Sequence, residues 1–337
     1  MKKQVFIGLA VAAVCLAYVL KDVDFARLWQ QARHLDPLYL LWVNLPIALG
    51  FWLRALRWRI LLAPVGRFSL AGLNWANLIG FGANNILPAR LGELVRAYVL
   101  GRLEDAPAGG VLATIVVERI LDGLMLLAIL FVTLLFVDPS ASAGAFDVAY
   151  LRGAGYSLLG LYLGVLAVMA ALWRWPRATL RLLTGLASRL SSRLGELVGR
   201  LLETFHQGLG ILGRAGHLPA LAAYTALIWL CYLAAFGVFL PAVGLPFRLI
   251  YAAMAFSGAG LAAAVPGGPG YVGAFQLAVS WALIMAGAPR QEAIAYSILF
   301  WAVQYFPLTA AGIVAMWRKG LDLASLQRAG RDLETKA

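Results

Sequence analysis

Residues 84–96 read Asn-Asn-Ile-Leu-Pro-Ala-Arg-Leu-Gly-Glu-Leu-Val-Arg, a polar stretch between two long apolar runs. Two amides come first, and two arginines and a glutamate follow the proline at position 88. Proline lacks a backbone N–H and breaks helices. The stretch therefore predicts a break in an apolar segment, followed by a second helix that carries charges.

The composition around this stretch is typical of a membrane protein. Of the 337 residues, 62% are hydrophobic and 13% are charged, and the mean hydropathy is +0.81. Soluble domains are nearer half apolar and a quarter charged. We therefore expect an all-α polytopic membrane protein whose chain is nearly all one membrane domain.

The net charge of +12 comes mostly from arginines that border apolar segments. Such residues orient membrane helices and contact anionic lipid headgroups. No basic segment with interleaved aromatic residues stands apart, so nucleic acid is excluded as a partner. The sequence contains two cysteines in apolar runs, three scattered histidines and no phosphate-binding loop, and we expect no metal and no cofactor.

The apolar runs predict the membrane domain. They lie at about 4–20, 38–63, 68–88, 91–103, 108–136, 150–173, 218–240, 249–265, 273–288 and 291–317. The first run has no signal-peptide cleavage site and is expected to be an uncleaved span. We divide the chain into a membrane domain at 1–317 and a short cytoplasmic tail at 318–337.

The distribution of basic residues predicts the orientation. Segment 174–217 carries seven arginines, whereas 137–149 carries no basic residue. Because Lys and Arg mark cytoplasmic loops, 174–217 is expected inside and 137–149 outside, with both termini cytoplasmic. The arginines at 54, 57, 59 and 67 are assigned to the same cytoplasmic border.

Leucines recur every three or four residues at about 177–214, with arginines on the opposite face. This periodicity predicts an amphipathic cytoplasmic helix on the inner leaflet. Packing of the apolar face against a partner helix is the alternative.

A second break is predicted at 265–271, which reads Val-Pro-Gly-Gly-Pro-Gly-Tyr. Three glycines and two prolines in six residues do not continue a helix. The orientation requires that 68–104 and 249–288 each enter the membrane and return. We therefore expect two re-entrant hairpins whose tips, Pro269 and Gly270 included, face a substrate cavity.

The element order of the second half is that of the first half turned upside down. A helix, a hairpin from the inside and a helix make up about 38–136, and the same elements with a hairpin from the outside make up about 218–317. Inverted repeats of this kind place the site of many transporters near the middle of the membrane. No identity between the halves is evident, so the predicted symmetry rests on topology and breakers.

Six ionisable residues lie within or beside the spans of the first half: Arg90, Glu93, Arg96, Glu118, Arg119 and Asp122. The first three are spaced by three residues and share a helix face, and Glu118 and Asp122 form an i, i+4 pair. A charge in the middle of a membrane helix costs about 2.5 to 3.5 kcal/mol. One interpretation is that three arginines and three carboxylates neutralise one another across two helices.

The other interpretation is a substrate-binding site for an anionic group. Guanidinium groups match phosphate oxygens, and a helix that begins after Pro88 adds free N–H groups. We expect the arginines, with the amides of Asn84 and Asn85, to hold a lipid headgroup. The carboxylates then hold the arginines in the empty site or carry protons.

Three motifs give the chain a resemblance to a known family. They are ILPARLGELVRAYVL at 86–100, VVERILDGL at 116–124 and PGGPGYVGAFQ at 266–276. Together they resemble the lysylphosphatidylglycerol synthase transmembrane family, a flippase-like domain found alone or fused in bacteria and archaea. The resemblance covers essentially the whole chain, and it implies a lipid-handling domain in the plasma (inner) membrane.

The fused members also carry a soluble aminoacyltransferase domain. Here 20 mostly polar residues follow Trp317, so synthase activity is not expected. Many members have a carboxylate where this chain has Gln276, and no role is assigned to that position.

We therefore expect a lipid flippase that moves an anionic or aminoacylated phospholipid, or a lipid-linked intermediate, between leaflets. The alternatives are a membrane-embedded headgroup transferase and an accessory subunit of a lipid-biosynthesis complex. A transferase base needs a carboxylate free of arginine, and each candidate here has an arginine within four residues. Membrane lipids are the expected partners, and a homo-oligomer or a lipid-pathway enzyme partner stays open.

Overall fold

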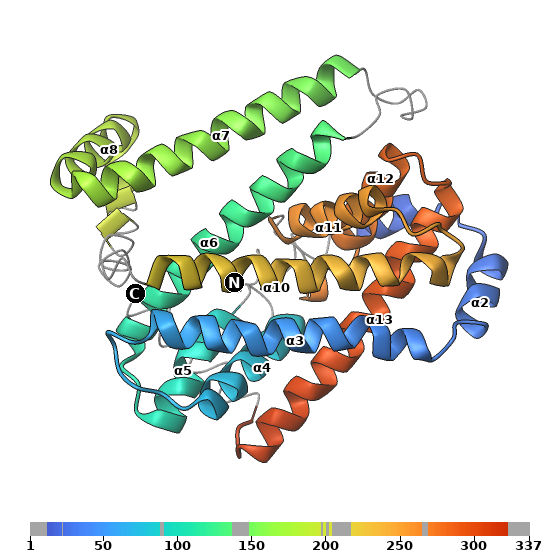
Figure 1. Ribbon diagram of the computed structural model, residues 1–337, viewed down its shortest axis with the longest axis horizontal. Helices are drawn as coiled ribbons and strands as arrows, with labels where there is room; N and C mark the ends of the chain where they lie inside the picture. The colour runs from blue at the N-terminus through green and yellow to red at the C-terminus, as the bar shows by residue number, and fades with distance from the viewer. Residues whose placement is uncertain are drawn as a thin grey trace.

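The computed structural model describes residues 12–21, 23–87, 91–136, 148–196, 198–199, 202–203, 217–264 and 269–322. Within these ranges the chain forms helices and no strand (Figure 1). Three segments are long and apolar enough to cross a membrane: α3 (Leu38–Leu61), α10 (Leu218–Val238) with η4 (Leu240–Val243), and α13 (Arg290–Arg318). The predicted all-α membrane protein is thus confirmed.

Further helices also lie in the apolar runs. They are α4 (Leu70–Ile86), α5 (Gly92–Glu104), α6 (Ala108–Leu135), α7 (Val148–Arg174), α11 (Leu249–Ala264) and α12 (Ala274–Met285), with the short 3-10 helix η5 (Pro269–Tyr271). Both predicted breaks fall between paired helices. Of the breaks themselves, 88–90 and 265–268 lie outside the described residues.

The segments between the apolar runs add two further helices. The segment 21–37 contains α2 (Phe25–Arg33), which begins where the Asp24 side chain accepts the N–H of Arg27 at 3.0 Å. The amphipathic helix predicted at about 177–214 is interrupted, because α8 (Pro176–Leu190) ends at Ser191, which is extended. Residues 192–196 are helical again, and 204–216 lie outside the described residues. Serine competes with helical hydrogen bonds and favours helix ends, and here two serines follow Leu190.

Glycines let α4 approach both α5 and α13 closely. A Cβ built at Gly80 of α4 would lie 2.7 Å from the carbonyl oxygen of Gly92 in α5. A Cβ at Gly82 would lie 2.8 Å from the Cα of Gly312, where α4 crosses α13. Small residues at such crossings are the usual means of packing helices within a membrane.

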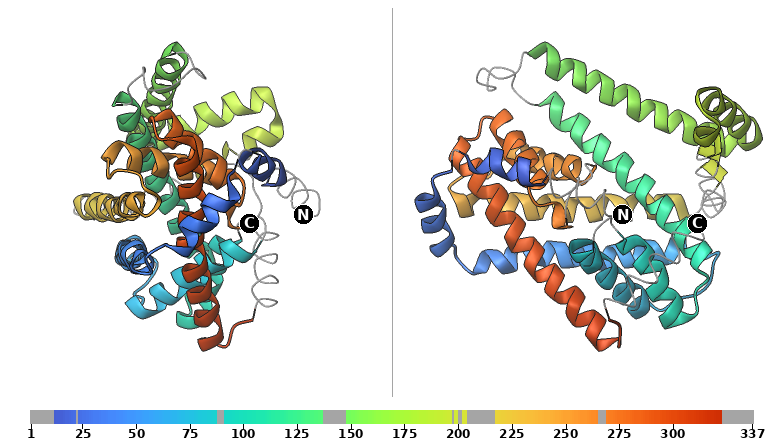
Figure 2. Two further views of the ribbon diagram at one scale, coloured as in Figure 1. Left: turned by 90° about the vertical axis from the view of Figure 1, so that its right-hand side faces the viewer. Right: turned by 180° about the vertical axis from the view of Figure 1, so that it is seen from behind.

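The two helix pairs lie toward opposite ends of the molecule. α3 and α10 run side by side in opposite directions (Figure 1). The pair α4 and α5 lies near the end of α3, and the pair α11 and α12 lies toward the start of α3. The view from behind in Figure 2 shows the same arrangement.

Candidate functional site

Buried arginines and carboxylates meet between α3, α5 and α6. Arg54 Nη1 lies 2.6 Å from Glu118 Oε1 and 2.8 Å from Asp122 Oδ2. Arg57 Nη1 lies 2.8 Å from Asp122 Oδ1. From α5, Arg96 donates to both carboxylate oxygens of Glu118, at 3.2 and 3.0 Å. We call the following residues the charged cluster: Arg54, Arg57, Arg96, Glu118, Arg119 and Asp122.

The middle of the cluster is closed to solvent. Arg57, Arg96 and Glu118 are at most 1% exposed. The second half of the chain closes one side, because Arg57 donates to the Thr225 hydroxyl at 3.0 Å and Trp229 Nε1 donates to Asp122 at 3.3 Å. Helices α3, α5, α6 and α10 therefore all contribute to one site.

Aromatic rings line the guanidinium groups. The Arg96 guanidinium carbon lies 4.2 Å from the centre of the Trp58 ring, and Trp58 Nε1 donates to Thr114 at 2.9 Å. The Phe81 ring of α4 faces the guanidinium groups of Arg54, Arg96 and Arg119 at 5.2, 5.5 and 5.9 Å. Ring faces attract cations, and they attract them more strongly away from water.

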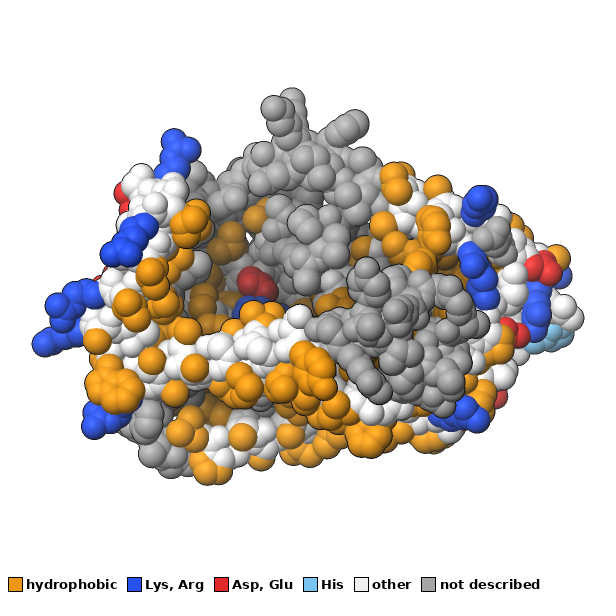
Figure 3. Space-filling model, turned by 90° about the horizontal axis from the view of Figure 1, so that it is seen from above, with side chains coloured by type: hydrophobic (Ala, Val, Ile, Leu, Met, Phe, Trp, Pro, Cys, Tyr) orange, Lys and Arg blue, Asp and Glu red, His pale blue; other side chains and the backbone are white. Residues whose placement is uncertain are grey.

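One edge of the cluster is open. The side chains of Arg119 and Glu93 are each 37% exposed, and Arg119 Nε lies 3.4 Å from Glu93 Oε1. Arg119 Nη2 lies 3.0 Å from Glu118 Oε1, so the open edge is continuous with the buried middle. Figure 3 shows a hollow on one face of the molecule, with acidic and basic side chains together at its floor.

Positive charge is in excess among the described groups. Four guanidinium groups face three carboxylates, Glu93 included, which leaves one net positive charge. Several buried guanidinium N–H groups also have no hydrogen-bond partner: the Nε of Arg54, Arg57 and Arg96. Arg119 Nε and Arg57 Nη2 make no hydrogen bond either, but they lie 3.4 Å and 3.6 Å from the carboxylates of Glu93 and Glu118. Unpaired buried donors are costly, so a site of this kind favours an additional acceptor.

The cluster lies well inside the helices. Along a helix each residue rises about 1.5 Å, so Arg54 lies about 10 Å from the end of α3 at Leu61. By the same rise Glu118 lies about 15 Å from the start of α6 at Ala108. The charges thus sit inside helices rather than at their ends.

The structure brings five predicted site residues together: Glu93, Arg96, Glu118, Arg119 and Asp122. Two further predicted residues hold helices in place. Asn84 Oδ1 accepts the N–H of Gly92 at 2.8 Å, at the start of α5, and Asn85 Nδ2 donates to Thr309 of α13 at 2.9 Å. Arg90 lies outside the described residues.

The second break packs against the end of α4. Trp301 Nε1 donates to the carbonyl oxygen of Gly270 at 2.8 Å, and Tyr305 donates to the carbonyl oxygen of Asn85 at 3.1 Å. A Cβ at Gly270, whose φ is +65°, would lie 2.3 Å from the Tyr305 ring. The ends of the two breaks therefore meet on one face of α13, with Pro269 opening η5 beside them.

Arg54 and Arg57, which the sequence analysis assigned to the cytoplasmic border and not to the site, belong to the charged cluster. Both are buried and bind the carboxylates of α6. Two signals in the sequence mark them. They lie inside the apolar run 38–63, and their i, i+3 spacing places them on one helix face.

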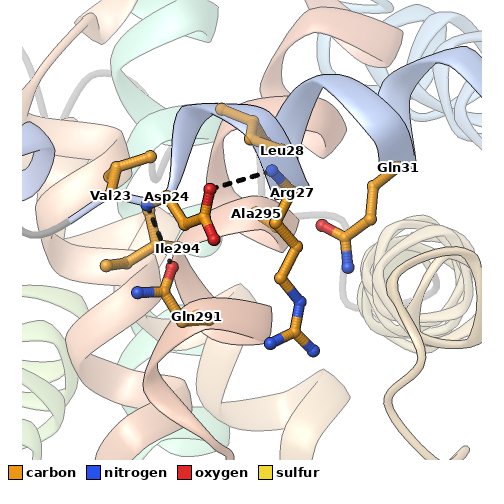
Figure 4. A pocket seen from close by; sticks show the side chains of 8 residues that line it. All are labelled: Val23, Asp24, Arg27, Leu28, Gln31, Gln291, Ile294 and Ala295. Carbon is orange, nitrogen blue, oxygen red and sulfur yellow. Dashed lines mark hydrogen bonds between the residues drawn. The ribbon is translucent and has the colours of Figure 1, made fainter.

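A small pocket lies elsewhere, between α2 and the start of α13. Figure 4 shows Asp24, which accepts the N–H of Arg27, and Gln291, whose side-chain oxygen accepts the N–H of Asp24. The pocket has room for about one water molecule and is too small for a lipid headgroup. Among the described residues, no group of His, Cys, Asp and Glu is arranged to hold a metal ion.

The sequence motifs and the membrane helices agree with a comparison to known families. The model of the lysylphosphatidylglycerol synthase TM region matches residues 5–312. The chain belongs to this family. The resemblance in the sequence motifs is thus confirmed, and the lysylphosphatidylglycerol synthase TM region is a membrane domain, which fits a role without catalysis.

One curated relative of this lysylphosphatidylglycerol synthase TM protein is the glycosyltransferase AglD of Haloferax volcanii. It is 26% identical over 94% of this chain and 55% of its own length. The chain thus spans about half the length of that relative, whose name denotes an enzyme. No solved structure gives a significant match.

Proposed function

We propose that this protein moves a lipid with an anionic headgroup between the two leaflets, and that the charged cluster is the headgroup site. The observation that supports the proposal is the excess of guanidinium donors over carboxylate acceptors inside an apolar bundle. A cluster that only neutralised itself would match donors and acceptors, because an unpaired buried charge is costly.

A phosphate group suits the unpaired donors. Its oxygens accept several hydrogen bonds from guanidinium groups at once. Arg119 and Glu93 form the entrance, because they are half exposed and contact the buried middle. A headgroup phosphate that enters there displaces Glu93 from Arg119 and binds the freed guanidinium.

The proposed topology has re-entrant hairpins and an inverted repeat. At about 1.5 Å per residue, the 17 residues of α4 span about 25 Å and the 12 residues of α12 about 18 Å, less than the roughly 30 Å hydrocarbon core. The two pairs also lie toward opposite ends of the bundle (Figure 1). Both termini are cytoplasmic in this arrangement.

The relative named as a glycosyltransferase favours a second candidate, transfer of a sugar to or from a lipid headgroup. The contacts argue against it in this chain. A general base needs a free carboxylate, whereas arginines bind Glu118, Asp122 and Glu93. The same name makes a lipid-linked sugar a natural cargo for transport.

The test is the redistribution of labelled lipids between leaflets of proteoliposomes. The panel contains phosphatidylglycerol, an aminoacylated phospholipid, a polyprenyl-phosphate sugar and a neutral diacylglycerol. We expect the native protein to move at least one phosphate-bearing lipid and Arg119→Ala to abolish that movement. Arg102→Ala removes an exposed charge from α5 outside the cluster and serves as the matched control. A folded native protein that moves none of these lipids, or an Arg119→Ala variant that still moves them, contradicts the proposal.

A further inference from the structure

Some residues of the two halves are identical at a constant spacing, which the motifs alone did not reveal. The following pairs are identical and 178 positions apart: Leu62 and Leu240, Val65 and Val243, Gly66 and Gly244, Gly80 and Gly258, Gly82 and Gly260, and Pro88 and Pro266. The helix bounds agree at this spacing. Adding 178 to the end of α4 at Ile86 gives Ala264, the end of α11.

After the two breaks, corresponding residues of the halves are 182 positions apart. α5 begins at Gly92 and α12 at Ala274. The dipeptide Ala106-Pro107 precedes α6, and Ala288-Pro289 precedes α13. The residues before these dipeptides, Asp105 and Gly287, both have left-handed backbones, with φ of +54° and +89°.

Packing follows the same correspondence. A Cβ at Gly80 would meet Arg96, and a Cβ at Gly258 would meet Ala278, which is the position of Arg96 plus 182. Glu118 corresponds to Phe300, and both are fully buried. The first copy thus carries a buried charge where the second has the uncharged Phe300, and Arg96 likewise corresponds to the uncharged Ala278.

One contact differs between the two copies. Each copy packs one helix against a helix of the other copy: α4 against α13, and α11 against α6. At the first of these crossings Gly82 lies directly against Gly312. The corresponding pair is Gly260 of α11 and Leu130 of α6, but a Cβ at Gly260 would meet Leu126, at 2.3 Å from Cδ1. The crossing of α6 is therefore wider and displaced by four residues, which is about one helical turn or 6 Å.

The charged cluster is built for a displacement of this size. Glu118 and Asp122 lie one turn apart on the same face of α6. If α6 moves by one turn toward its own N-terminus, Asp122 arrives where Glu118 now binds Arg54 and Arg96. The arginines therefore keep one carboxylate in the second position, in the place that Glu118 holds now.

We propose that the halves are two copies of one unit, and that α6 packs against α3 and α11 in two positions that differ by one helical turn. In the second position, which we call the second register, Gly260 faces Leu130, and Asp122 replaces Glu118 among the arginines. In the other copy the close contact opens at the same time: α13 moves away from α4 by one turn, and Gly82 then faces Leu308 in place of Gly312. One-turn shifts between packed helices are a known kind of two-state transition. The proposal does not depend on which lipid is carried.

Disulfide trapping in native membranes tests the second register. The full chain carries Cys15→Ser and Cys231→Ser, and then either Gly260→Cys with Leu126→Cys or Gly260→Cys with Leu130→Cys. A Cβ at Gly260 would lie 3.0 Å from Leu126 Cγ, the atom whose place a cysteine sulfur at position 126 would take. We expect both disulfides to form, each in its own register, and each to stop lipid movement until reduced. Gly260→Cys alone is the control for non-specific oxidation.

Two charge variants give the decisive comparison, because each removes one carboxylate from the same cluster. Glu118→Gln weakens the present register, so it should raise the ratio of the 260–130 to the 260–126 disulfide about tenfold. Asp122→Asn removes one of two buried carboxylates from the present register and the one that binds the arginines in the second, so it should lower the ratio. If the cluster only stabilises the fold, the two variants should not change the disulfide ratio in opposite directions.

The proposal is overturned if the 260–130 disulfide never forms, if the 260–126 disulfide never forms, or if both charge variants change the ratio in the same direction or not at all. If Glu118→Gln does not fold, the test rests on two other chains. The 260–130 disulfide must form when both carboxylates are present, and its yield must be lower in Asp122→Asn. Trapping needs no lipid assay, so its failure is distinguishable from a failure of the proposed function.

Discussion

Arg54 and Asp122 lie 2.8 Å apart across α3 and α6, although 68 positions separate them in the chain. This pair ties the first long membrane helix to the helix that carries the carboxylates. It also shows that the cluster belongs to the tertiary structure, because each of the two residues has its closest ion-pair partner on another helix. The following predictions test what each part of the site contributes.

Arg57→Ala and Arg119→Ala should separate stability from function. Arg57 is fully buried, and its loss removes the bonds to Asp122 and Thr225 and leaves a cavity, so we expect a loss of about 3 to 5 kcal/mol in the free energy of unfolding. Arg119 is 37% exposed, and its loss should cost about 1 kcal/mol or less while abolishing lipid movement. Thermal unfolding in detergent and the leaflet assay measure the two effects, with the exposed Arg59→Ala as the reference on α3. Equal destabilisation by the two substitutions would contradict this division.

Trp58→Ala should destabilise the protein by about 3 to 5 kcal/mol, because it removes a fully buried ring that packs on Arg96. Trp58→Phe keeps a ring face and loses the bond to Thr114, so about 1 kcal/mol is expected. Chemical denaturation of the purified protein measures both. If Trp58→Phe costs as much as Trp58→Ala, the ring face is not what stabilises the arginine.

Gly82→Ala should destabilise the crossing of α4 and α13 by about 1 to 3 kcal/mol, since the added Cβ would lie 2.8 Å from a backbone carbon of Gly312. Gly123→Ala is the matched case on α6, where the added Cβ has open space. There the better helix propensity of alanine should be neutral or add up to about 1 kcal/mol. Melting temperatures of the two variants should therefore move apart, and a shared downward shift would disprove the packing argument.

Asn84→Ala should cost about 1 kcal/mol, because it removes the acceptor of the Gly92 N–H at the start of α5. Asn74→Ala, about three turns earlier on α4, removes only a bond to the Leu70 carbonyl within the same helix and should be nearly neutral. Hydrogen exchange at the first turn of α5 reports the difference. Unchanged exchange at Gly92 in Asn84→Ala would show that the amide does not hold this helix end.

Much of the fold could be predicted from local patterns. Runs of apolar residues gave the helices of the membrane domain, and the prolines and glycines at 84–96 and 265–271 gave the divisions between paired helices. Both signals act over a few residues, through hydrophobicity and the loss of backbone donors. The amphipathic segment failed at Ser191, where the leucine periodicity continues but the preference of serine for helix ends interrupts the helix.

The candidate site divides in the same way. The sequence by itself determined which charges lie inside apolar segments, that Glu118 and Asp122 share a face of one helix, and that Arg96 and Glu93 precede them on another. Only the tertiary structure decided that Arg54 and Arg57 are their partners and that Asn84 and Asn85 hold helices. Periodicity fixes the face on which a side chain lies, but the helix opposite that face is chosen by packing between segments far apart in the chain.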